Sequence, residues 1–338
     1  MSIGKKKLMK MSGSAAALAL FLFLLFILFW PNTRKRATII IQHDTEYEQL
    51  IQQLDKDGVL KSMTTFRLTG KMLFYKKVKP GKYAFDKGSS NFSMIYKLRR
   101  GQHFPVRFSF TAARTKDLLV KKLSRKEFFF EWDELRKLLD DSLFLKQYGL
   151  TPETSIAVFM PNTYEFYYDI TAAEFFGKIY SYYAKFWNSE RAHLAEQIGL
   201  TPLEVITLAS IVEEENYRDF EKPTIAGLYM NRLHKEMRLQ SDPTVKFALG
   251  DFTLTRILHE HLKVDSPYNT YKYKGLPPGP IRTPSASSID AVLHYEHNNY
   301  LYMCAKEDFS GAHNFTDSYQ QHLKNAKKYQ KALDARKK

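Results

Sequence analysis

The longest apolar run of the chain lies close to its N-terminus. No charged residue occurs across residues 11–33, and Ala15 to Trp30 is almost wholly apolar. A run of this length can cross a bilayer, for which roughly 20 residues are needed, and Trp30 ends it as an interfacial aromatic residue does. We therefore predict a transmembrane helix over residues 11–33, with residues 1–10 as a cytoplasmic tail.

A cleavable signal peptide is the alternative for this run. Its end is bulky, from Phe21 to Trp30, and it offers no cleavage site of the small-x-small kind, which favours an uncleaved anchor. Four Lys residues precede the run, and Arg34, Lys35 and Arg36 follow it, so the positive-inside bias is slight. The simpler topology places the N-terminus in the cytoplasm and the rest of the chain on the extracytoplasmic side.

Short apolar segments separated by turn residues follow the anchor. Runs of β-branched and aromatic residues predict strands, and runs with a period near 3.6 predict helices. The expected strands are 38–41, a short one ending at Phe85, and 106–110; the expected helices are 47–54, 63–72 and 91–99. This pattern predicts a small α/β module over residues 37–107, followed by an aromatic-rich and mostly helical stretch from 112 to 188.

A second helix with a well-marked start begins at residue 202. Thr201, Pro202 and Glu204 form the pattern of a capping box with proline at the first helical position. At 100° per residue, an apolar stripe runs from Val205 through Leu208, Ile211 and Val212 along one face. The helix is therefore expected to run into the Glu213–Glu215 triplet and to hold it rigidly.

The three Glu residues differ in their place on this helix. Glu215 lies on the flank of the stripe, Glu213 further round, and Glu214 nearly opposite. A carboxyl group at the edge of an apolar face is poorly solvated, so its pKa rises, as a general acid at neutral pH requires. The alternative is that three Glu residues simply end a helix on a solvated face.

The charge balance suggests a polyanionic neighbour without identifying it. The chain of 338 residues carries 51 Lys and Arg against 36 Asp and Glu, a formal net charge of +15. Nucleic acid, anionic lipid headgroups and an acidic wall polymer all satisfy such an excess. No nucleic-acid-binding motif is visible, so we expect no nucleic-acid partner.

Cysteine and histidine give no sign of a metal or a thiol catalyst. The single Cys304 lies in an apolar segment that predicts a buried strand, where Cys is usually inert. Neither His259 and His261 nor His294 and His297 have the His-Glu-x-x-His spacing, and no Cys ligands accompany them. We expect no metal site and no cofactor.

A series of motif blocks runs along the chain, at 161–164, 209–215, 226–233, 237–245, 266–271, 275–281 and 313–315. In this order and approximate spacing, the blocks resemble those of the YceG-like family, the endolytic murein transglycosylases. The resemblance covers about Leu203 to Tyr329 strongly and the upstream part more weakly.

The resemblance implies a fold class and an organisation. It implies an α+β protein with an N-terminal transmembrane helix, a small LysM-like α/β module, and a larger mixed α/β catalytic domain over residues 108–338. A central helix of that domain would carry the catalytic Glu. The protein would lie in the cytoplasmic membrane as a single-pass protein with this domain on the extracytoplasmic, periplasmic side.

The resemblance also implies an activity. The family cuts peptidoglycan glycan strands between N-acetylmuramic acid and N-acetylglucosamine, leaves 1,6-anhydro-muramic ends, and would terminate nascent strands in association with peptidoglycan synthases. Glu215, at the family's catalytic position, would first protonate the glycosidic oxygen and then act as base on the muramoyl O6 hydroxyl. Because that hydroxyl attacks within its own sugar, the reaction gains from proximity and departs from two-carboxylate hydrolysis. Glu213 is the second candidate for the catalytic acid, and Asn216 stands where related enzymes tend to have a small hydroxyl residue.

Four further residues are predicted to bind substrate. Gln240 and Asp242 lie on a turn that leads into a helix, where Asp242 could bind sugar hydroxyls, cap the helix or be a second carboxylate. Asn269 and Tyr271 could hydrogen-bond to sugar rings and stack on them, or serve ordinary loop chemistry.

Two more side chains have expected structural places. Arg232 is expected to pair with a Glu, for which Glu213 is the candidate. His313 is expected in the cleft wall or the core.

Two other functions remain open from the sequence alone. One is a muramidase-like hydrolase that uses Glu215 and Asp242 with water. The other is a non-catalytic wall-binding protein that keeps the fold, which the intact Glu-x-Glu block disfavours.

Overall fold

The computed structural model describes residues 3–101, 103–124, 130–216 and 218–336. The described chain divides into two compact units. The first consists of the described residues within Met1–Phe108, Glu127–Phe130 and Tyr164–Thr171; the second consists of those within Ser109–Lys126, Glu131–Thr163 and Ala172–Lys338. The return of Tyr164–Thr171 to the first unit is a connection that the sequence did not predict.

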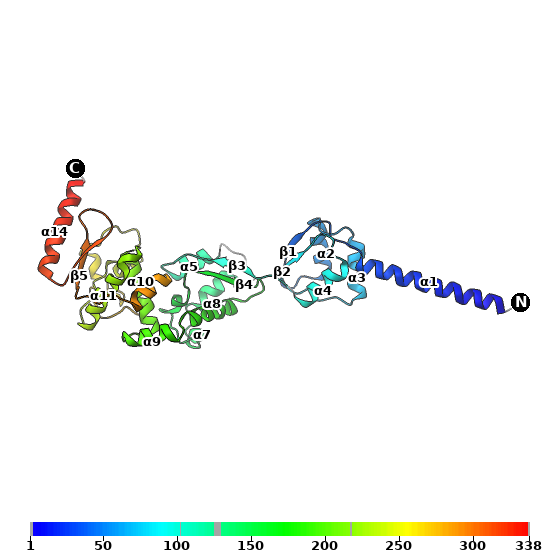
Figure 1. Cartoon of the computed structure of the whole chain (residues 1–338), viewed down its shortest axis with the longest axis horizontal. Helices are drawn as coiled ribbons and strands as arrows, with labels where there is room; N and C mark the ends of the chain where they lie inside the picture. Colours follow the sequence, from blue (N-terminus) through cyan, green and yellow to red (C-terminus); the bar gives the residue numbers. More distant parts are fainter. Residues whose placement is uncertain (1–2, 102, 125–129, 217, 337–338) are drawn as a thin grey trace. The chain divides into compact units, whose positions relative to one another are not determined.

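The first unit is a small module in which two strands flank two helices (Figure 1). Its predicted strands and helices are found within two residues of their expected bounds. They are β1 (Ala37–Ile41), α2 (Tyr47–Lys56), α3 (Met63–Met72), β2 (Gly81–Phe85), α4 (Asn91–Arg100) and β3 (Val106–Ser109), the last paired with β4 (Thr163–Phe166). Helix α1 (Ile3–Phe29) precedes them and departs from the predicted residues 11–33 at both ends.

The core of this unit forms on one face of the β1–β2 pair. The strands are antiparallel, with Ile39 opposite Tyr83 and Ile41 opposite Gly81. Because successive side chains of a strand alternate between faces, Ile39, Ile41, Tyr83 and Phe85 all lie buried on the same side. Leu50 from α2 and residues of α3 and α4 complete this core.

A buried polar joint ties the end of α1 to the first unit. The Asn91 side chain donates to the Ile27 carbonyl of α1 at 2.9 Å, and Asn32 donates to the Asn91 side chain at 2.6 Å. Asn32 also donates to the Ser62 carbonyl, and Thr33 is completely buried. Residues 32 and 33 therefore belong to the module. The helix ends at Phe29, short of the end predicted for the anchor.

Helix α1 contains the apolar run near the N-terminus. Ala15–Phe29 forms an apolar helical stretch, and no single helix among the described residues has both the length and the hydropathy of a bilayer span. The bent pair α9 (Ser189–Gln197) and α10 (Pro202–Glu215) reaches these values together. However, Val205 to Val212 of α10 lies in the protein core.

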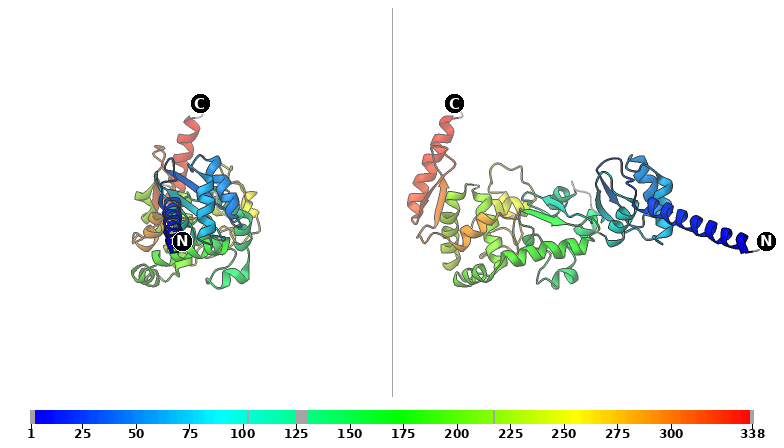
Figure 2. Two further views of the ribbon diagram at one scale, coloured as in Figure 1. Left: turned by 90° about the vertical axis from the view of Figure 1, so that its right-hand side faces the viewer. Right: turned by 45° about the vertical axis from the view of Figure 1, so that its right-hand side comes forward.

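The second unit is mostly helical, which corrects the expected mixed α/β domain. Among its described residues, β5 (Tyr302–Ala305) pairs with β6 (His313–Thr316) in an antiparallel two-stranded sheet, and α14 (Tyr319–Arg336) packs beside it (Figure 2). The other helices are α5 (Lys116–Leu123), α6 (Trp132–Leu138), α7 (Ser142–Lys146), α8 (Ala172–Phe186), α9, α10, α11 (Lys222–His234), α12 (Asp242–Leu249) and α13 (Ala286–Leu293), with short 3-10 turns at Ser155–Val158, Asp219–Glu221 and His261–Lys263.

Helix α10 is the centre of this unit and packs against α9, α11, α12 and α13. The predicted capping box is confirmed, because Thr201 accepts from the Glu204 N–H and the Glu204 side chain accepts from the Thr201 N–H at 2.8 Å. The predicted single stripe is too narrow, since every residue from Val205 to Val212 is buried. Ser210 is tolerated there because its hydroxyl accepts from the Ile281 N–H and donates to a carbonyl of its own helix.

Candidate active site

Glu215 is the last residue of α10, and its carboxyl group is held from two other helices. The Tyr229 hydroxyl of α11 and the Ser241 hydroxyl at the start of α12 both donate to Oε1, each at 2.6 Å. Among the described residues, no hydrogen bond is made to Oε2. The carboxyl group is therefore fixed by one oxygen and leaves the other available to a ligand.

The surroundings of Glu215 favour its protonated form. Burial is the largest influence and raises the pKa of the Glu215 carboxyl group, while the Ser241 and Tyr229 hydrogen bonds lower it. The charge of Asp242 raises the pKa and that of His313 lowers it, leaving the pKa above its ordinary value. This is the direction that a general acid needs near neutral pH.

Tyr229 is a dependable donor to this carboxyl group. Burial, followed by the proximity of Glu215, raises the pKa of the Tyr229 hydroxyl well above its ordinary value. The phenol therefore keeps its proton and donates a hydrogen bond to Oε1. Neither Tyr229 nor Ser241 was assigned a role from the sequence, although both lie in the motif blocks that carry the family resemblance.

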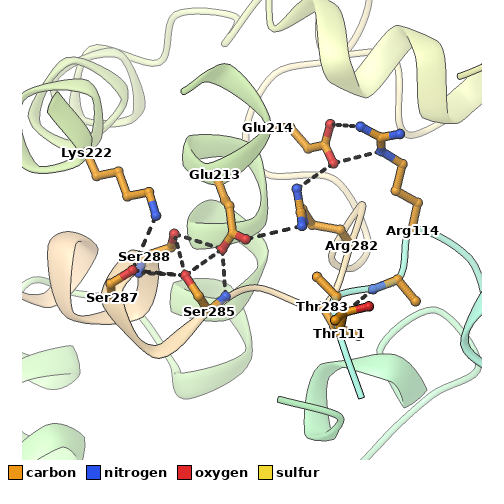
Figure 3. A network of polar contacts seen from close by, with 12 residues as sticks. Thr111, Arg114, Glu213, Glu214, Lys222, Arg282, Thr283, Ser285, Ser287 and Ser288 are labelled. Carbon is orange, nitrogen blue, oxygen red and sulfur yellow. Dashed lines mark hydrogen bonds and ion pairs between the residues drawn. The ribbon is translucent and has the colours of Figure 1, made fainter. Parts of the chain in front are cut away.

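Glu213 and Glu214 serve the structure, and they do not end the helix on a solvated face (Figure 3). Glu213 accepts from the Ser285 N–H at 2.6 Å and from the hydroxyls of Ser285 and Ser288 at 2.8 Å, at the start of α13. Arg282 lies 3.2 Å from Glu213. With these partners around it, Glu213 has no free oxygen comparable to Oε2 of Glu215, which favours Glu215 as the acid.

Glu214 is bound by two arginines. Arg114 donates to both of its oxygens at 2.8 Å, and Arg282 donates to Oε1 at 2.9 Å (Figure 3). Only 12% of the Glu214 side chain and 20% of the Arg282 side chain are exposed. The guanidinium groups of Arg114 and Arg282 thus fix the last turn of α10, and with it the position of Glu215.

A polar cleft of about 280 Å³ opens beside Glu215. It brings together Glu215 and three of the four residues predicted to bind substrate. The lining residues are Glu215, Leu228, Tyr229, Arg232, Leu239, Gln240, Asp242, Tyr271, Met303, Cys304, Ala305 and His313.

Gln240 and Asp242 lie on either side of Ser241 at the rim of the cleft. Gln240 adopts the left-handed region, with φ of 51°, and its N–H donates to the Thr270 carbonyl at 3.1 Å. Non-glycine residues in this region are uncommon and are found disproportionately at binding sites. Asp242 is the first residue of α12, and in the described part of the chain its side chain makes no hydrogen bond to a backbone N–H of this helix. Instead, its carboxylate accepts from the Tyr271 hydroxyl at 2.6 Å.

Asn269 lies away from the cleft, in the loop that precedes Tyr271. Its side chain is completely buried and donates to the carbonyls of Leu262 and Val264 at 2.9 and 2.8 Å. Its side-chain oxygen accepts from the Tyr271 N–H at 3.1 Å. All the polar groups of the amide are used within the loop, which favours the structural alternative for Asn269 and indicates that it positions Tyr271.

Arg232 does not pair with Glu213 as expected. Its guanidinium group donates to the carbonyls of Leu301 and Leu239, each at 2.7 Å, and lies 3.4 Å from the Gln240 side-chain oxygen. The side chain of Glu213 is occupied by Arg282 and by the serines at the start of α13. Arg232 therefore connects α11 to the residue that precedes β5 and to the rim segment before α12.

Cys304 and the histidine pairs complete the account of the predicted residues. Cys304 lies on a strand as predicted, but it is partly exposed and lines the cleft. Burial raises the pKa of its thiol, which disfavours the reactive thiolate. Within the described ranges, no group of three or more His, Cys, Asp or Glu residues is placed to hold a metal ion.

Comparison with known proteins identifies the family. The sequence model of the YceG-like family matches residues 39–328. The chain belongs to the YceG-like family. A crystal structure of a YceG-like protein from Listeria monocytogenes aligns with a TM-score of 0.53 and 26% sequence identity, covering 86% of this chain and 98% of that one.

Two curated relatives of this YceG-like chain carry the description endolytic murein transglycosylase. The Bacillus subtilis protein is 44% identical over 125 residues, which cover 37% of this chain and 34% of that protein. The Streptococcus pneumoniae D39 protein is 25% identical over 304 residues, which cover 81% of this chain and 55% of that protein. The matched stretches thus span about a third and about half of the lengths of these relatives.

Proposed function

We propose that this chain is an endolytic murein transglycosylase, which cleaves peptidoglycan glycan strands between N-acetylmuramic acid and N-acetylglucosamine. The observation that carries the proposal is one carboxylic acid with a raised pKa, fixed through Oε1 and open at Oε2, at a polar cleft. The relatives described as endolytic murein transglycosylases support the same reaction.

The cleavage needs no nucleophile from the protein. Glu215 donates its proton to the glycosidic oxygen, the bond from that oxygen to muramoyl C1 breaks, and the O6 hydroxyl of the same sugar forms the new bond to C1. The O6 proton leaves to a base, and the product ends in 1,6-anhydro-muramic acid. The attack is intramolecular, so it avoids the entropy cost of bringing a second molecule to C1.

The rim residues suit the substrate of this reaction. Gln240, Asp242 and Tyr271 supply amide, carboxylate and hydroxyl groups to a cleft whose other walls are partly apolar. Such a mixture binds sugars through their hydroxyl groups and their ring faces. We assign these three residues to glycan binding.

We also propose that α1 anchors the protein in the cytoplasmic membrane, with both units on the extracytoplasmic side and the first unit as a LysM-like module. The apolar stretch Ala15–Phe29 supports the anchor. We expect the protein to stay with membranes after an alkaline carbonate wash and to be extracted by detergent. Release by the wash alone would refute the anchor.

The function is tested by the chemistry of the product. The purified protein in detergent would be incubated with isolated glycan strands, and the ends formed inside the strands would be identified by mass spectrometry. Anhydro-muramic ends are the expected result. Reducing ends would instead show hydrolysis, with Asp242 as a second carboxylate, and absence of cleavage would leave a glycan-binding protein.

Replacing Ser241 with Ala is expected to shift the pH dependence of cleavage. The Ser241 hydroxyl donates to Glu215 and thereby lowers the pKa of its carboxyl group, so its removal raises that pKa further. Because the acid must be protonated, kcat/KM falls as pH rises through this pKa. The alkaline limb of the kcat/KM profile should therefore move to higher pH.

A second serine substitution provides the control for this measurement. Ser181 is exposed on α8 and donates only to a carbonyl one turn earlier, so Ser181→Ala should leave the profile unchanged. No side-chain cap is lost in Ser241→Ala, since the Ser241 hydroxyl does not cap α12. An alkaline limb that stays in place or moves to lower pH would contradict the assignment of Glu215 as the acid.

A further inference from the structure

A second carboxylate lies buried behind the wall of the cleft. Only 5% of Glu221 is exposed, and its carboxylate is surrounded by donors. It accepts from the Asn216 side chain at 2.6 Å and from the His313 N–H at 2.8 Å, and it lies 2.9 Å from the His313 Nδ1. The mechanism described so far does not use this group.

The carboxylate of Glu221 sets the tautomer of His313. An ionised carboxylate can only accept hydrogen bonds, and Glu221 already accepts two others. The Nδ1 atom that faces it therefore carries the proton. In the neutral ring the other nitrogen, Nε2, is then an acceptor with a free lone pair. A buried carboxylate holding the far nitrogen of an imidazole is the arrangement that prepares histidine as a general base in other enzymes.

The side chain of His313 reaches the cleft where substrate would bind. His313 lines the same cleft as Glu215, and 16% of its side chain remains exposed. Among the described residues, Nε2 has no hydrogen-bond partner. The two groups are close enough for the charge of His313 to act on Glu215.

We propose that His313 is the general base of the reaction and takes the proton from the muramoyl O6 hydroxyl, while Glu215 acts only as the acid. The proposal rests on the transglycosylase function. The Glu215 proton moves to the leaving oxygen, the O6 proton moves to Nε2, the C1–O6 bond forms and the bond from C1 to the leaving oxygen breaks. Return of the proton from His313 to Glu215 through solvent restores both groups.

The hydrogen bonds that restrain the Glu215 carboxyl group favour a mechanism in which two different residues make the two proton transfers. A single carboxyl group would have to donate to the leaving oxygen and then reach O6 with the same Oε2 atom. Oε1 is fixed by Tyr229 and Ser241, and the residue ends a helix that is buried along its length. A second base at the same cleft removes the need for Glu215 to move between two oxygens.

Glu221 and Asn216 act in this proposal as positioning residues. Asn216 donates to Glu221 and to the Gly311 carbonyl, at 2.6 and 3.2 Å, while its side-chain oxygen accepts from the Arg218 N–H at 2.9 Å. Asn216 thus holds Glu221 against the chain that leads into β6. The amide that follows the catalytic Glu in sequence is used behind His313, away from the cleft.

The test is chemical rescue of a His313 variant. His313→Gly and His313→Asn are expected to lower the rate of anhydro-muramic end formation by about 10²–10⁴-fold, the usual contribution of a general base. Added imidazole should restore the rate of His313→Gly by roughly tenfold or more and should not restore that of Glu215→Gln. His313→Asn keeps an amide that can donate to Glu221 but has no basic atom, so it should stay folded and inactive.

Controls separate this proposal from the function on which it rests. His193→Asn, at a histidine whose side chain is 65% exposed on α9, should match the wild type in rate and in thermal unfolding. Full activity in His313→Asn, or a folded His313→Gly that imidazole does not rescue, would overturn the base role and leave the transglycosylase function standing. Absence of anhydro ends from the wild type would reject the function itself.

Discussion

Replacing Glu215 with Gln is expected to lower the rate of glycan-strand cleavage by about 10²–10⁴-fold, the range for loss of a general acid. The amide has the shape of the carboxyl group, and its oxygen can still accept from Tyr229 and Ser241. What it lacks is an acidic proton on the side-chain atom that Tyr229 and Ser241 leave free. The rate of anhydro-muramic end formation, measured by mass spectrometry, gives the result directly.

The same helix offers a matched control. Glu204 lies at the third position of α10 and completes its capping box. Glutamine serves equally well at that position, so Glu204→Gln should keep both fold and rate. If Glu215→Gln cleaved strands at a rate within a few fold of the wild type, Glu215 would not be the acid, and Glu213 would have to be reconsidered.

Replacing Arg282 with Ala is expected to destabilise the second unit by about 3 kcal/mol, at the lower end of the cost of breaking a buried ion pair. Arg282 serves Glu213 and Glu214 together, at 3.2 and 2.9 Å, and both carboxylates are about nine-tenths buried. Without it, one positive charge from Arg114 remains beside two buried carboxylates. The serine hydroxyls around Glu213 soften the loss.

Denaturant unfolding measures this effect. Trp132 and Trp187 belong to the second unit and provide its fluorescence signal. Lys274→Ala is the control, because Lys274 and Glu236 form an exposed pair 3.6 Å apart in the same unit, and exposed pairs contribute little. Equal unfolding midpoints for Arg282→Ala and Lys274→Ala would show that the Glu213–Glu214 cluster does not hold the unit together.

The local elements of this fold were predictable because their signals are local. Helix α10 begins where its capping box places it, and α3 has the bounds expected from its apolar period. Such signals depend on residues three or four positions apart. The burial of α10 on all sides was not predictable in this way, since it depends on which helices surround it.

The site shows the same limit. Glu215 could be chosen from its position on a helix, but the partners that exclude Glu213 lie 69 or more residues away in sequence, just before and at the start of α13. Asn269 was expected at the cleft because it stands in a polar motif, yet nearby loop carbonyls occupy its amide. The pairing of Glu221 with His313 joins residues 92 positions apart and has no local signature.

The buried joint between α1 and the first unit has a mechanical consequence. After Phe29, the backbone is bonded to the unit at once, with Asn32 and Thr33 N–H groups donating to the Ser89 carbonyl and Arg34 N–H to that of Val59. These hydrogen bonds leave no flexible linker between the end of α1 and the unit. If α1 tilts or rotates, the first unit is therefore expected to turn with it.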